Sequence, residues 1–208
     1  MLKQTIKYLL YLFVITTSSW ACADSYVDFF RAVNVDNAGK VSELLDKGFD
    51  PNTKSENGQT GLYLAMQEDS PKVAAVLLAS PALNLEAANA VGETALMMAA
   101  LQGNVVWAKK MLERGAKVQK PGWSPVHYAA AGPSTELLAL LLDRGADINA
   151  VAPNGNTPLM MAARHGPEES VRLLVQRGAN KRLQNDRNLT AADLARNGDR
   201  IYLLKMLD

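Results

Sequence analysis

A seven-residue segment that opens with Thr or Ser recurs along this chain about every 33 residues. The clearest copy is Thr-Pro-Leu-Met-Met-Ala-Ala at 157–163. The other copies start at Thr60, Thr94, Ser124 and Thr190, so that successive starts lie 34, 30, 33 and 33 residues apart. A fixed period in this range is typical of a stack of small helical units and not of one globular core.

Each copy is followed by a second apolar segment, which we expect to be a second helix. A Thr or Ser hydroxyl can accept hydrogen bonds from free N–H groups at a helix start, and proline next to it suits the first turn. Glycine reaches left-handed backbone angles without a clash at Cβ, so it can end a helix and turn the chain. In the second unit Ser80 replaces this glycine, and in the third Trp107 falls at a position expected to be buried. The second helices are expected over 73–78, 105–112, 137–142 and 171–175, and the helix-ending glycines are Gly48, Gly115, Gly145 and Gly178.

The Thr-Pro-Leu segment and the turn Gly-Ala-Asp-Ile-Asn at 145–149 resemble the ankyrin repeat. The resemblance covers nearly all of residues 25–208, and it implies an all-α repeat solenoid of about six ankyrin repeats, each with two helices and a β-turn finger. The outermost units are expected to act as caps, because they show water a face that inner units bury. We expect one ankyrin-repeat domain over 24–208, with units at about 26–53, 54–86, 87–118, 119–150, 151–183 and 184–208.

The first 23 residues have the pattern of a cleavable signal peptide. Lys3 and Lys7 precede an apolar run at 8–15, and Ala-Cys-Ala at 21–23 is a small-residue cleavage pattern. The apolar run is shorter than the about 20 residues that a membrane-spanning helix needs. We expect a mature chain that starts at Asp24 and is not inserted in a membrane. The short signal with two lysines looks bacterial, which favours the periplasm.

Two alternatives stay open for this segment. One is a membrane anchor or a buried helix, and the other is a lipoprotein acylated on Cys22. Ser19 and Trp20 depart from the usual bacterial lipobox that would precede such a cysteine. Cleavage after Ala23 would remove the one cysteine of the chain and change its formal net charge from +1 to −1. A domain of this charge gives no electrostatic reason to expect nucleic acid as a partner.

The residue types that catalysis or metal binding requires are sparse. The two histidines, His127 and His165, do not have the spacing of a zinc site, and no nucleophile elbow or phosphate-binding glycine loop is present. We therefore expect no enzyme, no cofactor and no metal. The resemblance implies that His127 bonds the neighbouring backbone turn, and His165 is expected at the surface.

The resemblance also implies that the chain binds another protein through the concave face, which is formed by the fingers and the ends of the first helices. Two fingers depart from the regular length of ten residues: Gly115 to Gly122 is seven, and Ser80 to Gly92 is twelve. Trp123 follows the short finger, where it either anchors a partner or fills the gap. The candidate partner-binding residues are Val91, Glu93, Leu101, Gln102, Lys120, Trp123, Asn154, Asn156, Arg164 and His165.

Two more specific functions are compatible with this expectation. Exported bacterial ankyrin proteins that the chain resembles are associated with a catalase and oxidative-stress defence, which favours an accessory protein for a periplasmic enzyme. The alternative is an immunity protein that neutralises a toxin delivered into the same compartment. In either role we expect a protein that is monomeric alone and binds its partner without catalysis.

Overall fold

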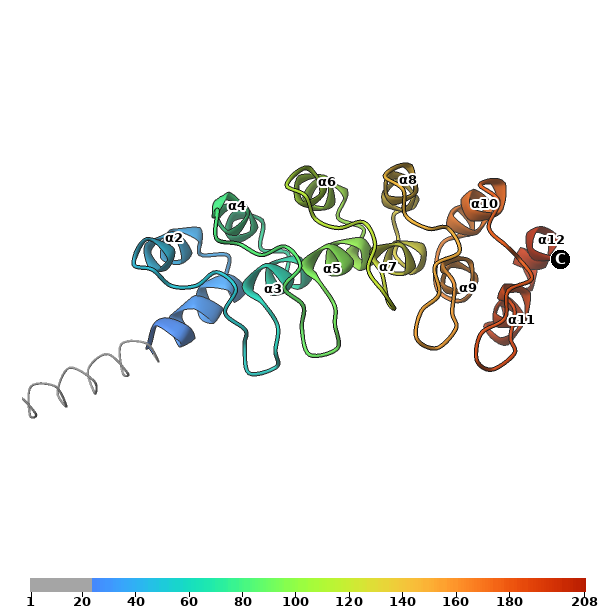
Figure 1. The fold of residues 1–208 in the computed structure, drawn as a ribbon, viewed down its shortest axis with the longest axis horizontal. Helices are drawn as coiled ribbons and strands as arrows, with labels where there is room; N and C mark the ends of the chain where they lie inside the picture. Colours follow the sequence, from blue (N-terminus) through green and yellow to red (C-terminus); the bar gives the residue numbers. More distant parts are fainter. Residues whose placement is uncertain (1–23) are drawn as a thin grey trace, which may run out of the picture.

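The structure, a computed structural model, describes residues 24–208, which form a row of six helix pairs (Figure 1). The signal peptide expected over residues 1–23 lies outside the described residues. The inner helix of the first pair covers residues 24–34. The other inner helices are α3 (Gly61–Gln67), α5 (Ala95–Gln102), α7 (Pro125–Ala131), α9 (Pro158–Arg164) and α11 (Ala191–Asn197). The outer helices are α2 (Ala38–Asp46), α4 (Pro71–Ala79), α6 (Val105–Glu113), α8 (Thr135–Asp143) and α10 (Glu168–Gln176), and the last pair ends with the short helices η1 (Ile201–Leu203) and α12 (Leu204–Leu207).

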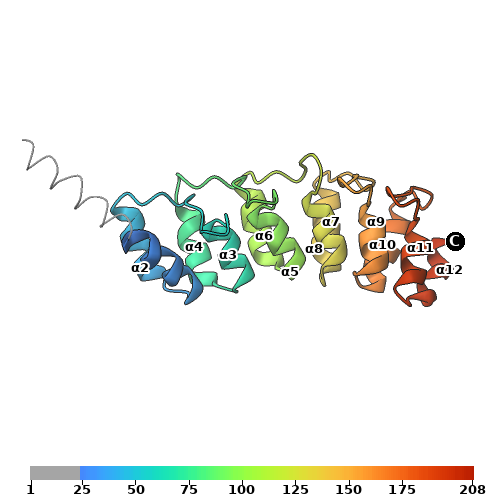
Figure 2. The same cartoon turned by 90° about the horizontal axis from the view of Figure 1, so that it is seen from below.

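The helices stack in two layers along the long axis of the molecule. Each inner helix from α3 to α11 packs against the next inner helix, and α2 with α4, α6 with α8, and α8 with α10 do the same in the outer layer. Figure 2 shows the pairs lying side by side with their axes across the row. This architecture confirms the all-α repeat solenoid. Among residues 24–208 no helix has the length and apolar character that crossing a membrane requires.

The expected hydroxyl cap starts four of the five inner helices from α3 onward. Thr60 Oγ1 accepts from Tyr63 N at 3.3 Å, and Thr94, Thr157 and Thr190 make the same bond. Ser124 differs from the expectation, because its buried hydroxyl has no hydrogen-bond partner among the described residues. At this helix the His127 N–H donates to the Ser124 carbonyl at 3.0 Å, and the His127 ring accepts from the Ser124 N–H at 3.3 Å.

Left-handed glycines end the outer helices where the sequence predicts them. Gly48, Gly115, Gly145 and Gly178 have φ angles of 86° to 93°. The residue after each glycine donates its N–H to a carbonyl five residues back, which satisfies an otherwise free group at the helix end. At Ser80, which has a φ of −70°, the helix end is stabilised by the next unit. The Arg114 guanidinium donates to the Leu78 carbonyl and, at 3.1 Å, to the Ser80 carbonyl.

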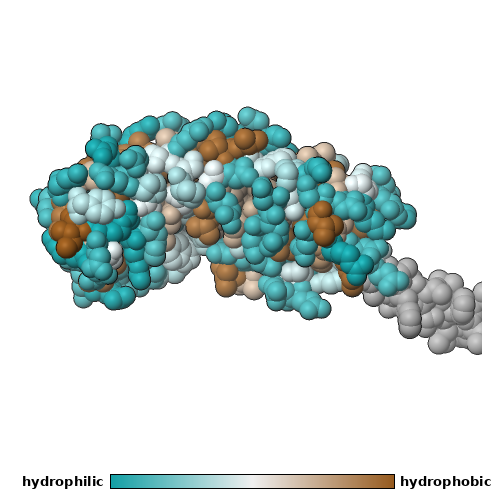
Figure 3. All heavy atoms as spheres, turned by 180° about the vertical axis from the view of Figure 1, so that it is seen from behind, coloured by the Kyte–Doolittle hydropathy of each residue, from teal (hydrophilic) through white to brown (hydrophobic). Residues whose placement is uncertain are grey.

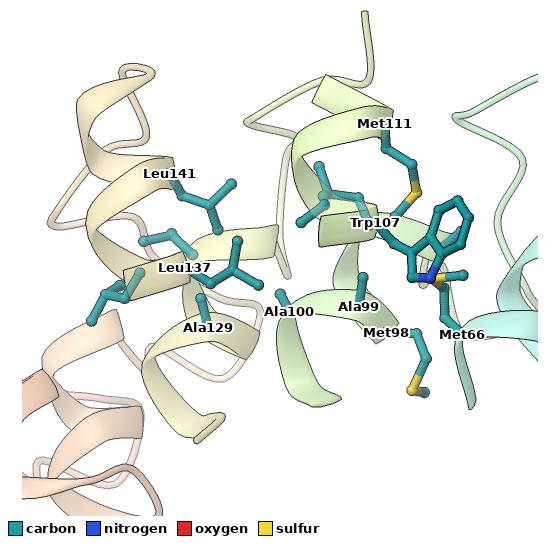
Figure 4. Packing of buried hydrophobic residues seen from close by; sticks show 14 of the residues in the cluster. Met66, Met98, Ala99, Ala100, Trp107, Met111, Ala129, Leu137 and Leu141 are labelled. Carbon is teal, nitrogen blue, oxygen red and sulfur yellow. The ribbon is translucent and has the colours of Figure 1, made fainter. Parts of the chain in front are cut away.

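The core runs continuously through the stack, between the inner and outer layers. Paired alanines of the inner helices, among them Ala99 and Ala100, are fully buried and let neighbouring helices approach closely (Figure 4). Leu141 is also fully buried, and it points with Leu137 from α8 toward α7. Trp107 is buried between units, as its position predicts, and the Lys110 ammonium lies 4.1 Å from the centre of its ring.

Candidate protein-binding surface

The fingers and the inner helices form one continuous side of the stack, called here the inner face. The fingers cover residues 53–60, 87–94, 119–124, 152–157 and 185–190, each directly before an inner helix. In four of them a backbone N–H donates to the carbonyl four residues later and closes a hairpin, for example Asn89 N to Glu93 O at 2.9 Å. The backbone bonds of residues 119–124 include no such closure, and Figure 1 shows that this finger ends short of its neighbours.

Glu93, one of the predicted residues, lies at the centre of a hydrogen-bond network that joins three consecutive units. Its Oε2 accepts from the Tyr63 hydroxyl at 2.9 Å and from Asn89 Nδ2 at 2.8 Å. Its Oε1 accepts from the Tyr128 hydroxyl at 2.7 Å. The two tyrosines come from α3 and α7, on either side of the Glu93 finger. The network therefore fixes the side chain of Glu93 relative to both neighbouring units.

This network keeps Glu93 ionised although it is half-buried. Burial by itself would raise the pKa of Glu93, but the hydrogen bonds from Tyr128, Asn89 and Tyr63 outweigh it and lower the pKa. Burial and the bond to the carboxylate raise the pKa of Tyr63 to about 12, and they raise that of Tyr128 as well. All three donors are neutral at physiological pH, so the negative charge of Glu93 is solvated by hydrogen bonds and is not cancelled by a cation.

An apolar pocket of about 140 Å³ opens beside the Tyr128 ring. Trp123 packs edge-on against Tyr128, with the ring centres 6.1 Å apart and the planes at 74°. Trp123 is half-buried and also packs against His127, so it contributes both to the support of the short finger and to the exposed surface. The pocket is lined by Leu101, Trp123, Tyr128, Ala131 and Met161. The structure thus brings the predicted residues Leu101 and Trp123 together, although they come from different units.

The other predicted residues of the two irregular fingers lie at their edges. Val91 is the most exposed large apolar residue of the described chain, with 74% of its surface accessible. Lys120 crosses from the short finger to the finger at 87–94, where its ammonium donates to the Gly92 carbonyl at 2.5 Å. The short finger is therefore tied to its neighbour by a side chain in place of its own hairpin bond.

Asn156 does not lie at an exposed position, in contrast to the expectation. It is only 8% exposed, because its Oδ1 accepts from Asn185 Nδ2 at 2.8 Å across the fingers of adjacent units. We therefore assign Asn156 to the packing between fingers. Its neighbour Asn154 is exposed at the tip of the same finger, and the Asn154 carbonyl accepts from the backbone N–H of Asp186.

Three predicted residues lie at the ends of inner helices. Arg164 and His165 are exposed at the end of α9, and burial, together with the charges of Arg164 and Arg200, lowers the pKa of His165. Gln102 is exposed at the end of α5 and lines a separate hollow between α3 and α5. None of these three residues lines the pocket beside Trp123.

The sequence prediction missed Tyr63, Tyr128 and Asn89. The tyrosines lie 30 residues before and 35 residues after Glu93, close to one repeat period on each side. This spacing could have indicated that both hydroxyls reach the same carboxylate. The prediction that His127 bonds a neighbouring turn is confirmed, since Nε2 lies 3.0 Å from the Ala150 carbonyl. Among the described residues no group of three or more His, Cys, Asp or Glu could hold a metal ion.

Seen from behind the view of Figure 1, the apolar side chains at the surface are scattered among hydrophilic ones (Figure 3). Ion pairs of residues 24–208 involve helices, for example Lys109 with Glu136 between α6 and α8. None of the ion pairs among these residues includes a finger residue. The fingers thus carry polar and charged groups that the stack itself does not pair by charge.

Known proteins with similar sequences include two B-cell lymphoma 3 proteins. The chain is 34% identical over 172 residues to the mouse B-cell lymphoma 3 protein homolog and 36% identical to the human B-cell lymphoma 3 protein. Both matches cover 79% of this chain but only 38% of the relative, so the chain spans about two fifths of their length.

Solved structures extend the similarity to nearly whole chains. The ankyrin repeat domain of Bcl-3 matches with a TM-score of 0.68 and 33% identity, covering 85% of this chain and 81% of that one. A chain in the complex of the Bd0816 predatory endopeptidase from Bdellovibrio bacteriovorus with immunity protein Bd3460 matches with a TM-score of 0.73 and 27% identity. That match covers 86% of this chain and 96% of the other. The family described as ankyrin repeats (3 copies) matches residues 29–121 and 108–185. The chain belongs to the ankyrin-repeat family.

Proposed function

We propose that this ankyrin-repeat protein binds a protein partner through its inner face, without catalysis. The observation that carries the proposal is the pocket of Trp123, Tyr128 and Leu101 beside the Glu93 carboxylate. A tryptophan in such a setting is typical of residues that dominate binding energy. A rigid stack also loses little conformational entropy on binding, so that shape and a few anchors set the affinity.

The partner that we favour is an exported hydrolase, which the protein would hold inactive as an immunity protein. This proposal is supported by the match to a chain of the endopeptidase–immunity protein complex, which extends over 96% of that chain. An accessory role for a periplasmic enzyme such as a catalase is the alternative, and none of the similar proteins described above supports it specifically.

The proposed place of action is the periplasm, on the basis of the signal-peptide pattern in residues 1–23. The intact mass of the protein isolated from its own cells should correspond to a chain that starts at Asp24. A mass that retains an acylated Cys22 would instead make it a membrane-anchored lipoprotein.

Site-specific photo-cross-linking in the native cells tests the binding surface. A photo-reactive amino acid at Val91, on the inner face, should give a covalent adduct with one partner protein. The same amino acid at Ala75, which is exposed on the outer helix α4, should give none. Adducts from Ala75 alone would contradict the proposed surface.

The identity of the cross-linked partner then separates the two roles. We expect a hydrolase whose activity is lost when one equivalent of the purified protein is added. A partner whose activity is unchanged or increased would exclude the immunity role and favour the accessory one.

A further inference from the structure

We propose that the Trp123 pocket and the Glu93 carboxylate together form a socket for an arginine side chain of the partner. The proposal rests on the proposed function, because it names the chemistry of the residue that the inner face would bind. The socket consists of the pocket-lining residues and Glu93.

The charge of Glu93 has no cationic partner within the described part of the chain. No Lys, Arg or His nitrogen there lies within 4.0 Å of its carboxylate, and its hydrogen bonds come from two hydroxyls and one amide. The nearby Lys120 donates instead to the Gly92 carbonyl. A half-buried carboxylate without a counter-charge is electrostatically complementary to a cation supplied by another molecule.

The walls of the pocket restrict which cation fits. Trp123 and Tyr128 meet edge to face, and Leu101, Ala131 and Met161 close the pocket with apolar surface. The aliphatic stem of a long cationic side chain can fill this pocket, and a planar guanidinium can stack on the aromatic rings. Arginine has both features and is more weakly hydrated than a lysine ammonium, so it loses less solvation when it enters such a site.

Tyr128 connects the apolar and charged parts of the socket. Its ring forms one wall of the pocket, and its hydroxyl donates to Glu93 Oε1 at 2.7 Å. A side chain that lies along the Tyr128 ring is thereby led toward the carboxylate. Tyr63 and Asn89 hold the other carboxylate oxygen, so the acceptor is already oriented before any partner binds.

Short peptides provide the test, with the wild-type protein and no need for the natural partner. Acetyl-Ala-Arg-Ala-amide is titrated while the indole N–H signals of Trp123 and Trp107 are followed by NMR. We expect the Trp123 signal to shift saturably and the buried Trp107 signal to stay in place. The same peptide with citrulline, which has the shape of arginine without its charge, should bind at least tenfold more weakly. A lysine peptide should bind several-fold more weakly than the arginine peptide.

A matched pair of variants tests the role of the carboxylate. Glu93→Gln should weaken binding of the arginine peptide at least fivefold, whereas Glu56→Gln, on the exposed neighbouring finger, should leave it unchanged. Equal affinity for arginine and citrulline would overturn the socket, and this comparison holds even if Glu93→Gln disturbs the fold. An equal loss of affinity for the arginine peptide in Glu93→Gln and Glu56→Gln would also overturn the proposed socket.

The peptide titration and the cross-linking experiment test different claims, so the failure of one can be told from the failure of the other. If the arginine peptide does not shift Trp123 but Val91 still cross-links to a partner, the socket is wrong and inner-face binding stands. If Val91 gives no adduct, inner-face binding of a protein is wrong whatever the peptides do.

Discussion

At the scale of single residues, His127 links two backbone turns as a neutral imidazole. Its Nδ1 accepts from Ser124 N at 3.3 Å, so Nε2 carries the proton and donates to the Ala150 carbonyl. Burial lowers the pKa of His127, and the bonds to backbone groups offset this only in part. Protonation of Nδ1 would also break the bond from Ser124, so burial and this bond together favour a neutral ring in the folded chain.

The stability of the protein should therefore fall when the pH is lowered from 7 to 5. The unfolded chain takes up the His127 proton near its ordinary pKa of 6.5, and the folded chain does so only at lower pH. The loss of unfolding free energy begins below about pH 6.5, with a slope of at most about 1.4 kcal/mol per pH unit for one proton. Urea unfolding at several pH values measures it.

Two glutamine variants show which histidine causes this pH dependence of stability. Gln in place of His127 can still accept from the helix-start N–H, as in a capping box, but it does not titrate. His127→Gln should flatten the stability profile between pH 6.5 and 5, and His165→Gln should keep most of it because His165 is exposed. An unchanged slope in His127→Gln would show that other groups cause it.

Trp123 is the residue at which binding and stability should separate most clearly. Trp123→Ala is expected to weaken partner binding by more than about 2 kcal/mol, because it removes a wall of the pocket. The melting temperature should fall much less than for a core variant, since Trp123 is only half-buried. Calorimetric titration with the cross-linked partner, alongside thermal unfolding, measures both. An unchanged affinity would mean that the partner binds elsewhere.

At the scale of helices, stability depends on the leucines between the two layers. Leu141 in α8 is fully buried, and Leu141→Ala should cost about 2–5 kcal/mol, as buried leucine truncations do. Leu101 in α5 is 38% exposed, so Leu101→Ala should change the unfolding free energy by no more than about 0.5 kcal/mol. Urea unfolding of Leu141→Ala and Leu101→Ala measures the two changes in unfolding free energy. An unchanged midpoint for Leu141→Ala would contradict the assigned core.

The helix end at Ser80 depends on the following unit for its hydrogen bonds. Arg114→Ala should lower the free energy of unfolding by about 1 kcal/mol, because it leaves the Leu78 and Ser80 carbonyls without these hydrogen bonds. Arg144 is the matched control, since it occupies the same position one unit later and makes no comparable bond within residues 24–208. Thermal unfolding of the two variants should therefore differ, and equal losses would mean that Arg114 contributes only surface charge.

The elements were predictable from the sequence because each unit repeats the same local chemistry. Threonine caps and left-handed glycines act within a few residues, so a single chain displays them as a period. The contacts between units were not predictable in the same way. The Glu93 network, the Asn156–Asn185 pair and the Arg114 bridge each join residues about one repeat apart. Each includes a residue, namely Glu93, Asn156 or Ser80, whose type does not recur at the same position of the other units.

At the scale of the whole molecule, the two sides of the stack differ in how their charges are arranged. The ion pairs lie on helices, many of them on the outer layer, whereas the finger side carries Glu93 without a counter-ion and the apolar pocket beside it. Each unit contacts mainly its neighbours, so the stack holds the inner face as one extended surface. The central claim is that this surface, and not the outer layer, binds the partner.

Hydrogen–deuterium exchange of the protein, measured with and without the cross-linked partner, tests this claim most directly. The account predicts slower exchange in the fingers at 87–94 and 119–124 and at the ends of α5 and α7, with the outer helices α4, α6 and α8 unchanged. Slower exchange confined to the outer helices, with the fingers unaffected, would contradict it.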